Sequence, residues 1–295
     1  MTLEDPLVWT RWVHFVATMA LFGSSLFPFY ACKARDRASV RGARSLVAIV
    51  VLSGLAWLVA SITYVTDQGS PFDSETLIVF FFQTSFGKVW ILRLALLLCI
   101  AIVGLSRMER NFRTFLVMLL SGLLVSQALL GHAAMGRGWR GLLMSTAYSM
   151  HVLAAALWFG GLVPLARLLL RMPRDAGGEE RHRSFESFSR FSAVAFAAML
   201  VIIATGIANT VLHVHLPSEL VLSDYGRVIT LKAALLACVL LLACVNRFIL
   251  MPRLSIEQRA RSARSALVRT IAAEFLFGVV ILGAAALLGT LPPPD

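Results

Sequence analysis

Apolar runs of about 20 residues recur along the whole chain, each long enough to cross roughly 30 Å of hydrocarbon at about 1.5 Å per residue. The chain is 58% hydrophobic, against roughly 45–50% in soluble domains. The runs lack the alternation of barrel strands, and lipid offers no partners to backbone groups, so helices are expected. The sequence predicts an all-α polytopic membrane protein of about eight transmembrane helices, near residues 7–30, 45–66, 86–106, 112–134, 144–170, 191–214, 226–251 and 267–290.

The net charge of +11 reports membrane topology rather than a nucleic-acid partner. Lys and Arg gather in the connections that follow the first, third, fifth and seventh runs. The intervening connections hold acidic residues such as Asp67, Glu75 and Asp224, with Arg137 and Arg140 as the basic exception. The positive-inside rule therefore predicts cytoplasmic basic loops and both termini on the outer face of a bacterial-type plasma membrane.

Two halves of the chain resemble each other. His14 and His151 each precede a glycine by nine residues, at an offset of 151 − 14 = 137, and Phe86-Gly87 matches Tyr225-Gly226 at 225 − 86 = 139. These matches predict two parallel four-helix repeats, residues 1–137 and 138–295, within one membrane domain. Small residues after each histidine, including Gly23 and Gly160, predict a close approach of the first and fifth helices.

Histidines cluster at the outer ends of the predicted helices. A lone intramembrane histidine is well explained by a hydrogen bond between helices, but a cluster favours a metal site. Imidazole and thioether ligands suit copper, whereas the outer ends lack the thiolates of a structural zinc site. The predicted metal ligands are His14, His132, Met135, His151, His213 and His215, with His14 and His151 as the core of the site.

Polar residues inside the predicted helices extend this hypothesis to a pathway. Arg93 and Lys232 occupy matching repeat positions, and as cations they are expected to act electrostatically or to extend towards a membrane surface rather than to bind metal. Asn209 lies four residues before His213, on the same helix face. Glu274, in the inner half of the last helix, is expected to pair with Arg247 or Arg269, or to relay protons.

Several segments together resemble the copper resistance protein D (CopD) family of bacterial inner-membrane proteins. They are the run at 151–162, Leu130-Gly131-His132-Ala133, Thr205-Gly206 with Asn209, Tyr225-Gly226-Arg227 with Lys232, and Asn246-Arg247-Phe248. The resemblance covers essentially the whole chain. It implies copper uptake across the inner membrane in copper homeostasis, with a separate periplasmic copper-binding protein of the CopC type as partner. It also implies His14, His132, His151 and His213 as copper-site residues.

Three functions remain open on the sequence. The leading hypothesis is a copper transporter without enzymatic activity, and no phosphate-binding loop for ATP is present. The second is a b-type cytochrome with haem b held between His14 and His151. The third is a copper acceptor or assembly factor that passes the metal on without transporting it.

Overall fold

The computed structural model describes residues 5–31, 40–66, 72–106, 110–130, 138–172, 178–213, 216–254, 256–292 and 294. All regular elements in these ranges are helical. Eight helices are long and apolar enough to cross a membrane, which confirms the predicted all-α class and number of spans. They are built from α1 (Pro6–Tyr30), α2 (Val40–Val65), α4 (Ser85–Leu105), α5 (Arg110–Val125), α6 (Gly138–Arg171), α7 (Gly178–His213), α9 (Asp224–Cys244) and α11 (Glu257–Leu288).

Short segments adjust the ends of several spans. A π-helical segment, η4 (Val245–Leu250), and the three-residue α10 (Met251–Arg253) extend α9, and η2 (Ser126–Leu129) continues α5 as a 3₁₀ turn. The helices α6 and α7 have 34 and 36 residues, longer than the apolar runs predicted, because polar turns continue the helix beyond the apolar stretch.

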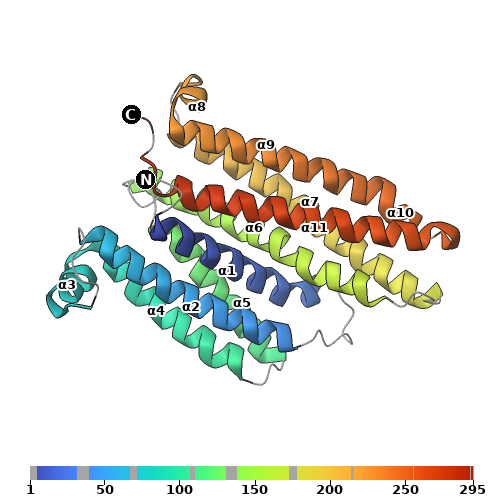
Figure 1. Ribbon diagram of the computed structural model, residues 1–295, viewed down its shortest axis with the longest axis horizontal. Helices are drawn as coiled ribbons and strands as arrows, with labels where there is room; N and C mark the ends of the chain where they lie inside the picture. The colour runs from blue at the N-terminus through green and yellow to red at the C-terminus, as the bar shows by residue number, and fades with distance from the viewer. Residues whose placement is uncertain are drawn as a thin grey trace.

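The helices α1 and α6 lie side by side at the centre of the molecule (Figure 1). One group of helices, α2, α4 and α5, lies on one side of this pair, and α7, α9 and α11 lie on the other (Figure 1). The described ends of the chain, at the start of α1 and after α11, lie at the same end of the bundle (Figure 1). That end is called the terminal end below.

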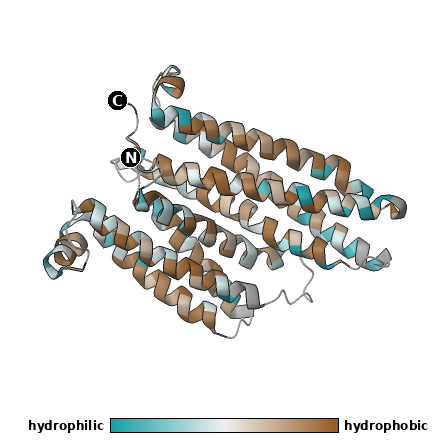
Figure 2. Ribbon diagram, in the orientation of Figure 1, coloured by the Kyte–Doolittle hydropathy of each residue, from teal (hydrophilic) through white to brown (hydrophobic). Residues whose placement is uncertain are grey.

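The outer faces of the spans are apolar along most of their length, as Figure 2 shows. Large side chains such as Leu52, Ile102 and Leu241 are between 64% and 68% exposed. Soluble proteins rarely expose contiguous apolar surface on this scale, whereas lipid covers it at no cost. The surface is that of a membrane protein.

Glycines bring α1 and α6 into direct backbone contact, as the sequence predicted. A Cβ atom added to Gly23 would lie 2.5 Å from the carbonyl oxygen of Ala156 and 2.6 Å from the Cα of Gly160. Ser24 also donates a hydrogen bond of 3.1 Å to the Gly160 carbonyl. Small residues therefore set the spacing of the central helix pair.

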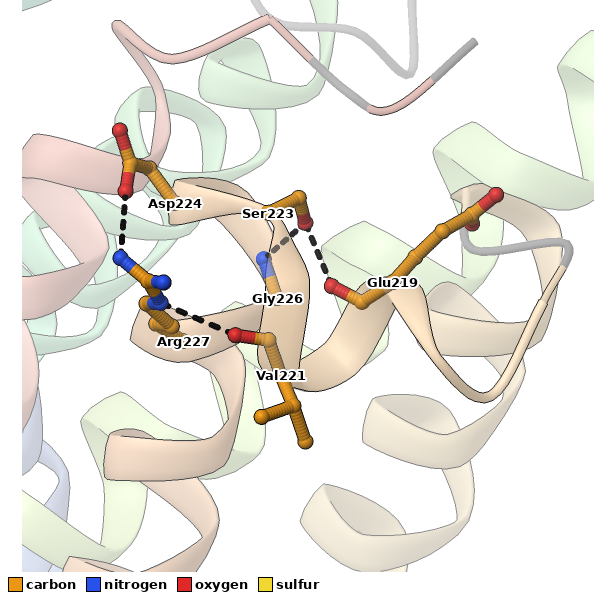
Figure 3. Close-up of polar contacts among 6 residues, drawn as sticks. All are labelled: Glu219, Val221, Ser223, Asp224, Gly226 and Arg227. Atoms are coloured by element: carbon orange, nitrogen blue, oxygen red, sulfur yellow. Dashed lines mark hydrogen bonds and ion pairs between the residues drawn. The ribbon is translucent and has the colours of Figure 1, made fainter.

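Two spans begin with the same unpredicted local structure. The short helix α8 (Glu219–Leu222) precedes α9, and Ser223 connects the two. The Ser223 hydroxyl accepts from the Gly226 amide at 2.9 Å and donates to the Glu219 carbonyl at 2.6 Å (Figure 3). A Cβ at Gly226 would lie 2.1 Å from that carbonyl oxygen, so only glycine fits. Arg227 closes the turn by donating to the Val221 carbonyl at 2.9 Å (Figure 3).

The start of α4 repeats this arrangement. There α3 (Ser74–Ile78) and the π-helical η1 (Val79–Gln83) precede the span. Thr84 accepts from the Gly87 amide at 2.8 Å and donates to the Phe80 carbonyl at 2.6 Å. A Cβ at Gly87 would lie 1.9 Å from that carbonyl oxygen. Both glycines of the sequence match are thus required by a helix-start turn of the same design.

Candidate functional site

His14 is completely buried between α1, α2 and α4. Its Nε2 lies 3.1 Å from a guanidinium nitrogen of Arg93, and its Nδ1 lies 3.2 Å from the Ser53 hydroxyl. A guanidinium only donates hydrogen bonds, so Nε2 accepts and Nδ1 carries the ring proton. The Ser53 hydroxyl accepts a hydrogen bond from Nδ1 and donates one to the Val50 carbonyl at 3.2 Å. Both ring nitrogens of His14 therefore have protein partners.

Arg93 is fully buried, which excludes the one of its two predicted roles in which it extends towards a membrane surface. It donates to the Ser126 hydroxyl at 2.7 Å and to the Leu123 carbonyl at 3.2 Å. Its guanidinium carbon also lies 4.6 Å from the ring centroid of Trp57 and 5.0 Å from that of Trp90. Neutral partners and aromatic faces thus stabilise a cation that has no carboxylate partner among the described ion pairs.

His151, on α6, has a different environment. Its Nδ1 lies 3.0 Å from the Thr205 hydroxyl, which donates its own proton to the Val201 carbonyl at 2.5 Å. The hydroxyl is therefore the acceptor, Nδ1 carries the proton, and Nε2 keeps its lone pair. Within the described residues, no hydrogen bond to this Nε2 is found. The ring is oriented by one nitrogen and available for binding through the other.

A cavity of about 1160 Å³ begins at the terminal end and contains His151 in its lining. On α1 the lining extends from Leu7 to Met19, a distance of about 18 Å at the rise of an α-helix. On α9 it extends from Tyr225 to Leu240. The cavity thus reaches from one end of the bundle to past the middle of the spans.

The structure does not bring His14 and His151 together in this cavity. Arg11, Phe15 and Met19 share one face of α1 and line it, whereas His14 lies about 100° around the helix from Phe15 and faces α2 and α4. His14 is not among the lining residues. The two histidines occupy separate polar clusters.

The remaining predicted ligands fall at the edge of what is described. His132, Met135 and His215 lie outside the described residues. His213 is the last residue of α7, and its side chain is likewise outside the described part. In the ranges that are described, no group of three His, Cys, Asp or Glu side chains is arranged to hold a metal ion.

Two of the predicted pathway residues line the cavity beside His151. Lys232, on α9, is close enough to His151 to interact with it electrostatically, and Asn209 lines the cavity from α7. Sequence reasoning missed four further lining residues, Arg11, Met19, Gln127 and Tyr148. Arg11 and Tyr148 each lie three residues before a repeat-matched histidine, a signal that the sequence contained.

Glu274 has other partners than those predicted. Its Oε1 accepts from the Asn246 amide at 2.6 Å, and it also interacts with Trp158. Arg247 instead donates to the Ser192 hydroxyl at 2.7 Å, and Arg269 is exposed. The carboxyl group is 4% exposed and lies behind Trp158, which lines the cavity.

Known families match both halves of the chain. The N-terminal domain of copper resistance protein D-like proteins matches residues 2–142, and the copper resistance protein D family matches residues 185–288. No solved structure matches the chain.

Three relatives align along nearly the whole chain. Inner membrane protein YebZ of Escherichia coli (strain K12) is 28% identical, covering 96% of this chain and 97% of the relative. Copper transport protein CutJ of Bacillus subtilis (strain 168) is 26% identical, covering 96% of this chain but 52% of that longer protein. Copper resistance protein D of Pseudomonas syringae pv. tomato is 31% identical, covering 99% of this chain and 98% of the relative. This chain, with its eight apolar helices, therefore belongs to the copper resistance protein D family.

Proposed function

We propose that this protein takes up copper across the bacterial inner membrane through the cavity at its terminal end, with His151 as the first ligand inside the membrane. The observation that carries the proposal is a neutral imidazole with an unoccupied Nε2 in the lining of a deep cavity. Imidazole bound through one nitrogen, with the other held by a hydroxyl or carbonyl, is a common metal ligand. The name of the relative CutJ supports copper as the transported ion.

Soft ligands are available to complete the shell. Met19 lines the same cavity, and thioether sulfur favours monovalent copper. His132, Met135, His213 and His215, which the sequence predicts at the outer ends of spans, remain proposed contributors. His14 has a different role in this proposal, because binding a metal through Nε2 would remove the acceptor of the buried Arg93. Haem ligation between His14 and His151 would likewise remove the hydrogen-bond acceptor that His14 offers to Arg93.

The difference between the histidines follows from a proposed duplication into residues 1–137 and 138–295. Each histidine is held through Nδ1 by a hydroxyl beside a glycine, Ser53-Gly54 or Thr205-Gly206. The counterpart of Trp57, four residues after Ser53, is Asn209, four residues after Thr205. Both residues line the cavity, but the large ring of Trp57 also packs on the buried guanidinium of Arg93, whose carbon lies 4.6 Å from the ring centroid. We infer that the first repeat became a filled structural cluster and the second kept an open site.

The inner half of the bundle is packed closed in this conformation. The rings of Phe159 and Phe275 stack with centroids 4.7 Å apart, and a Cβ at Gly278 would lie 2.6 Å from Phe159. Copper release on the cytoplasmic side therefore requires these helices to move apart. Glu274 lies in this closed region and accepts from Asn246 of the π-helical segment η4. We propose the Glu274 carboxyl as the proton-carrying group of the pathway.

Copper uptake by purified protein in liposomes tests the transport proposal. We expect saturable accumulation of copper inside the vesicles, and a purified protein whose absorption spectrum lacks a Soret band. A periplasmic copper-binding protein of the CopC type is the proposed donor, so copper supplied on such a protein should also be taken up. Copper bound by the protein without any accumulation would favour an acceptor or assembly factor, and a Soret band would favour the cytochrome.

The orientation of the protein is proposed from its charges, with both termini in the periplasm. A cysteine placed at the exposed Ser218 should react with an impermeant maleimide added to intact spheroplasts, whereas one at the exposed Ser262 should react only after lysis. Both variants are made in a background with Cys32, Cys99, Cys238 and Cys244 replaced. Labelling of Ser262→Cys but not Ser218→Cys in intact spheroplasts would invert the orientation.

A further inference from the structure

The cavity around His151 carries positive charge without the acidic groups that a cation site would need. Arg11 and Lys232 line it, and no described Asp or Glu does. The described acidic residues near its mouth are used elsewhere: Asp5 accepts from the Leu7 amide at 2.8 Å, Glu219 accepts from the Leu216 amide at 3.2 Å, and Asp224 pairs with Arg227 at 3.3 Å.

The two cations in the lining lack anionic partners. Lys232 makes no hydrogen bond and no ion pair with the described residues. Arg11 lies 5.7 Å from the ring centroid of Phe15 and 5.6 Å from that of Trp57, and its buried Nε has no hydrogen-bond partner. Arg93 also has a buried Nε without a partner, but its other guanidinium nitrogens donate to three neutral groups and it does not line the cavity. Arg11 and Lys232 are therefore available to a ligand.

A neutral donor in the same lining is also unused. Gln127 is 4% exposed, lines the cavity, and its amide nitrogen has no hydrogen-bond partner. Buried donors of this kind are rarely left without an acceptor in a folded protein. Two cations and an unused amide donor together form a site that suits a negatively charged hydrogen-bond acceptor.

A bare copper ion fits this charge distribution poorly. Like charges a few Å apart repel each other, and the repulsion falls when the ion carries negative ligands of its own. Monovalent copper with two chlorides has a net charge of −1, and copper bound to carboxylates is likewise neutral or negative. Such complexes present soft metal to an imidazole and acceptor atoms to cations.

We infer that copper occupies this cavity as a complex with small anions, whose negative charge Lys232 and Arg11 bind while the Nε2 of His151 coordinates the metal. The inference rests on the proposed function and specifies the form of its substrate. The anion comes with the copper from solution, as chloride or as a carboxylate. Lys232 is then a specificity residue for the complex rather than a barrier to the metal.

The test is a titration of purified protein with monovalent copper at constant ionic strength, in which sodium chloride or sodium acetate replaces sodium methanesulfonate. Acetonitrile at one fixed concentration keeps the metal in solution in all three media. Wild type and Lys232→Gln are compared in each medium, so that changes in free copper affect both proteins equally. Lys88→Gln is the matched control, because Lys88 is exposed at the start of α4 and does not line the cavity.

We expect Lys232→Gln to bind copper about tenfold more weakly than wild type in the medium that supplies the anion, a ratio that shrinks towards one in methanesulfonate. If the ratio of the two affinities rises in only one of the chloride and acetate media, the anion of that medium is the one that Lys232 binds. An equal ratio in all three media, or tighter binding by Lys232→Gln, would overturn the inference while leaving copper binding established. Wild type that binds no copper in any medium would instead overturn the proposed function.

Discussion

Replacing Arg93 by Ala should lower the free energy of unfolding by about 3–5 kcal/mol, because the change removes hydrogen bonds and leaves a void at the centre of the first four spans. His14 Nε2 would keep only the Thr18 hydroxyl, 3.5 Å away, as a partner, and the rings of Trp57 and Trp90 would lose the cation that packs on them. Arg93→Met keeps most of the volume and should cost less, about 1–3 kcal/mol for the lost hydrogen bonds of the guanidinium. Thermal and denaturant-induced unfolding of the detergent-solubilised proteins measures the free energy of unfolding of both variants.

The matched control for Arg93 is Arg227→Ala at the start of α9. Arg227 has an exposed side chain that pairs with Asp224 at 3.3 Å and donates to the Val221 carbonyl at 2.9 Å, and exposed interactions of this kind contribute at most about 1 kcal/mol each. We also expect folded Arg93→Ala protein to keep the copper affinity of wild type, because Arg93 does not line the cavity. Unchanged stability of Arg93→Ala, or loss of copper from a folded variant, would refute the structural role assigned to this residue.

Hydropathy and residue size along the chain were sufficient to predict the number of spans and the contact of the two central helices. Apolar runs of membrane-spanning length gave eight helices, and the glycines after the repeat-matched histidines gave the close approach of α1 and α6. These features are local in sequence, since hydropathy and residue size act on each helix directly. The turns before α4 and α9 were not predicted, although the two glycines that they require stood in the repeat match.

The side-chain partners were harder to predict because they depend on helix rotation. Whether His14 faces a cavity or another helix depends on a turn of about 100° per residue, which depth in the membrane does not determine. Equal depth suggested that His14 and His151 share one site, and the structure instead places a guanidinium against His14. In the same way, Glu274 was expected to pair with Arg247 or Arg269, and it instead accepts from Asn246, the residue that precedes Arg247 on the neighbouring span.

Replacing His151 by Ala should have the largest effect on copper. Outer-shell partners of metal-ligating histidines typically change affinity by about 10–100-fold, so removing the ligand itself should cost at least about 100-fold. Thr205→Val keeps the shape of the residue but removes the hydroxyl that orients the ring, and should cost about 10–100-fold. Neither change removes a charge, and His182→Ala, on an exposed residue of α7, is the control.

The copper affinity and stoichiometry of purified His151→Ala, measured beside wild type, Thr205→Val and His182→Ala, decide whether copper binds at His151. We expect a graded series in which His182→Ala equals wild type, Thr205→Val is weaker, and His151→Ala loses nearly all bound copper while remaining folded. Full copper content and wild-type affinity in folded His151→Ala would contradict it, and would place the copper site outside this cavity.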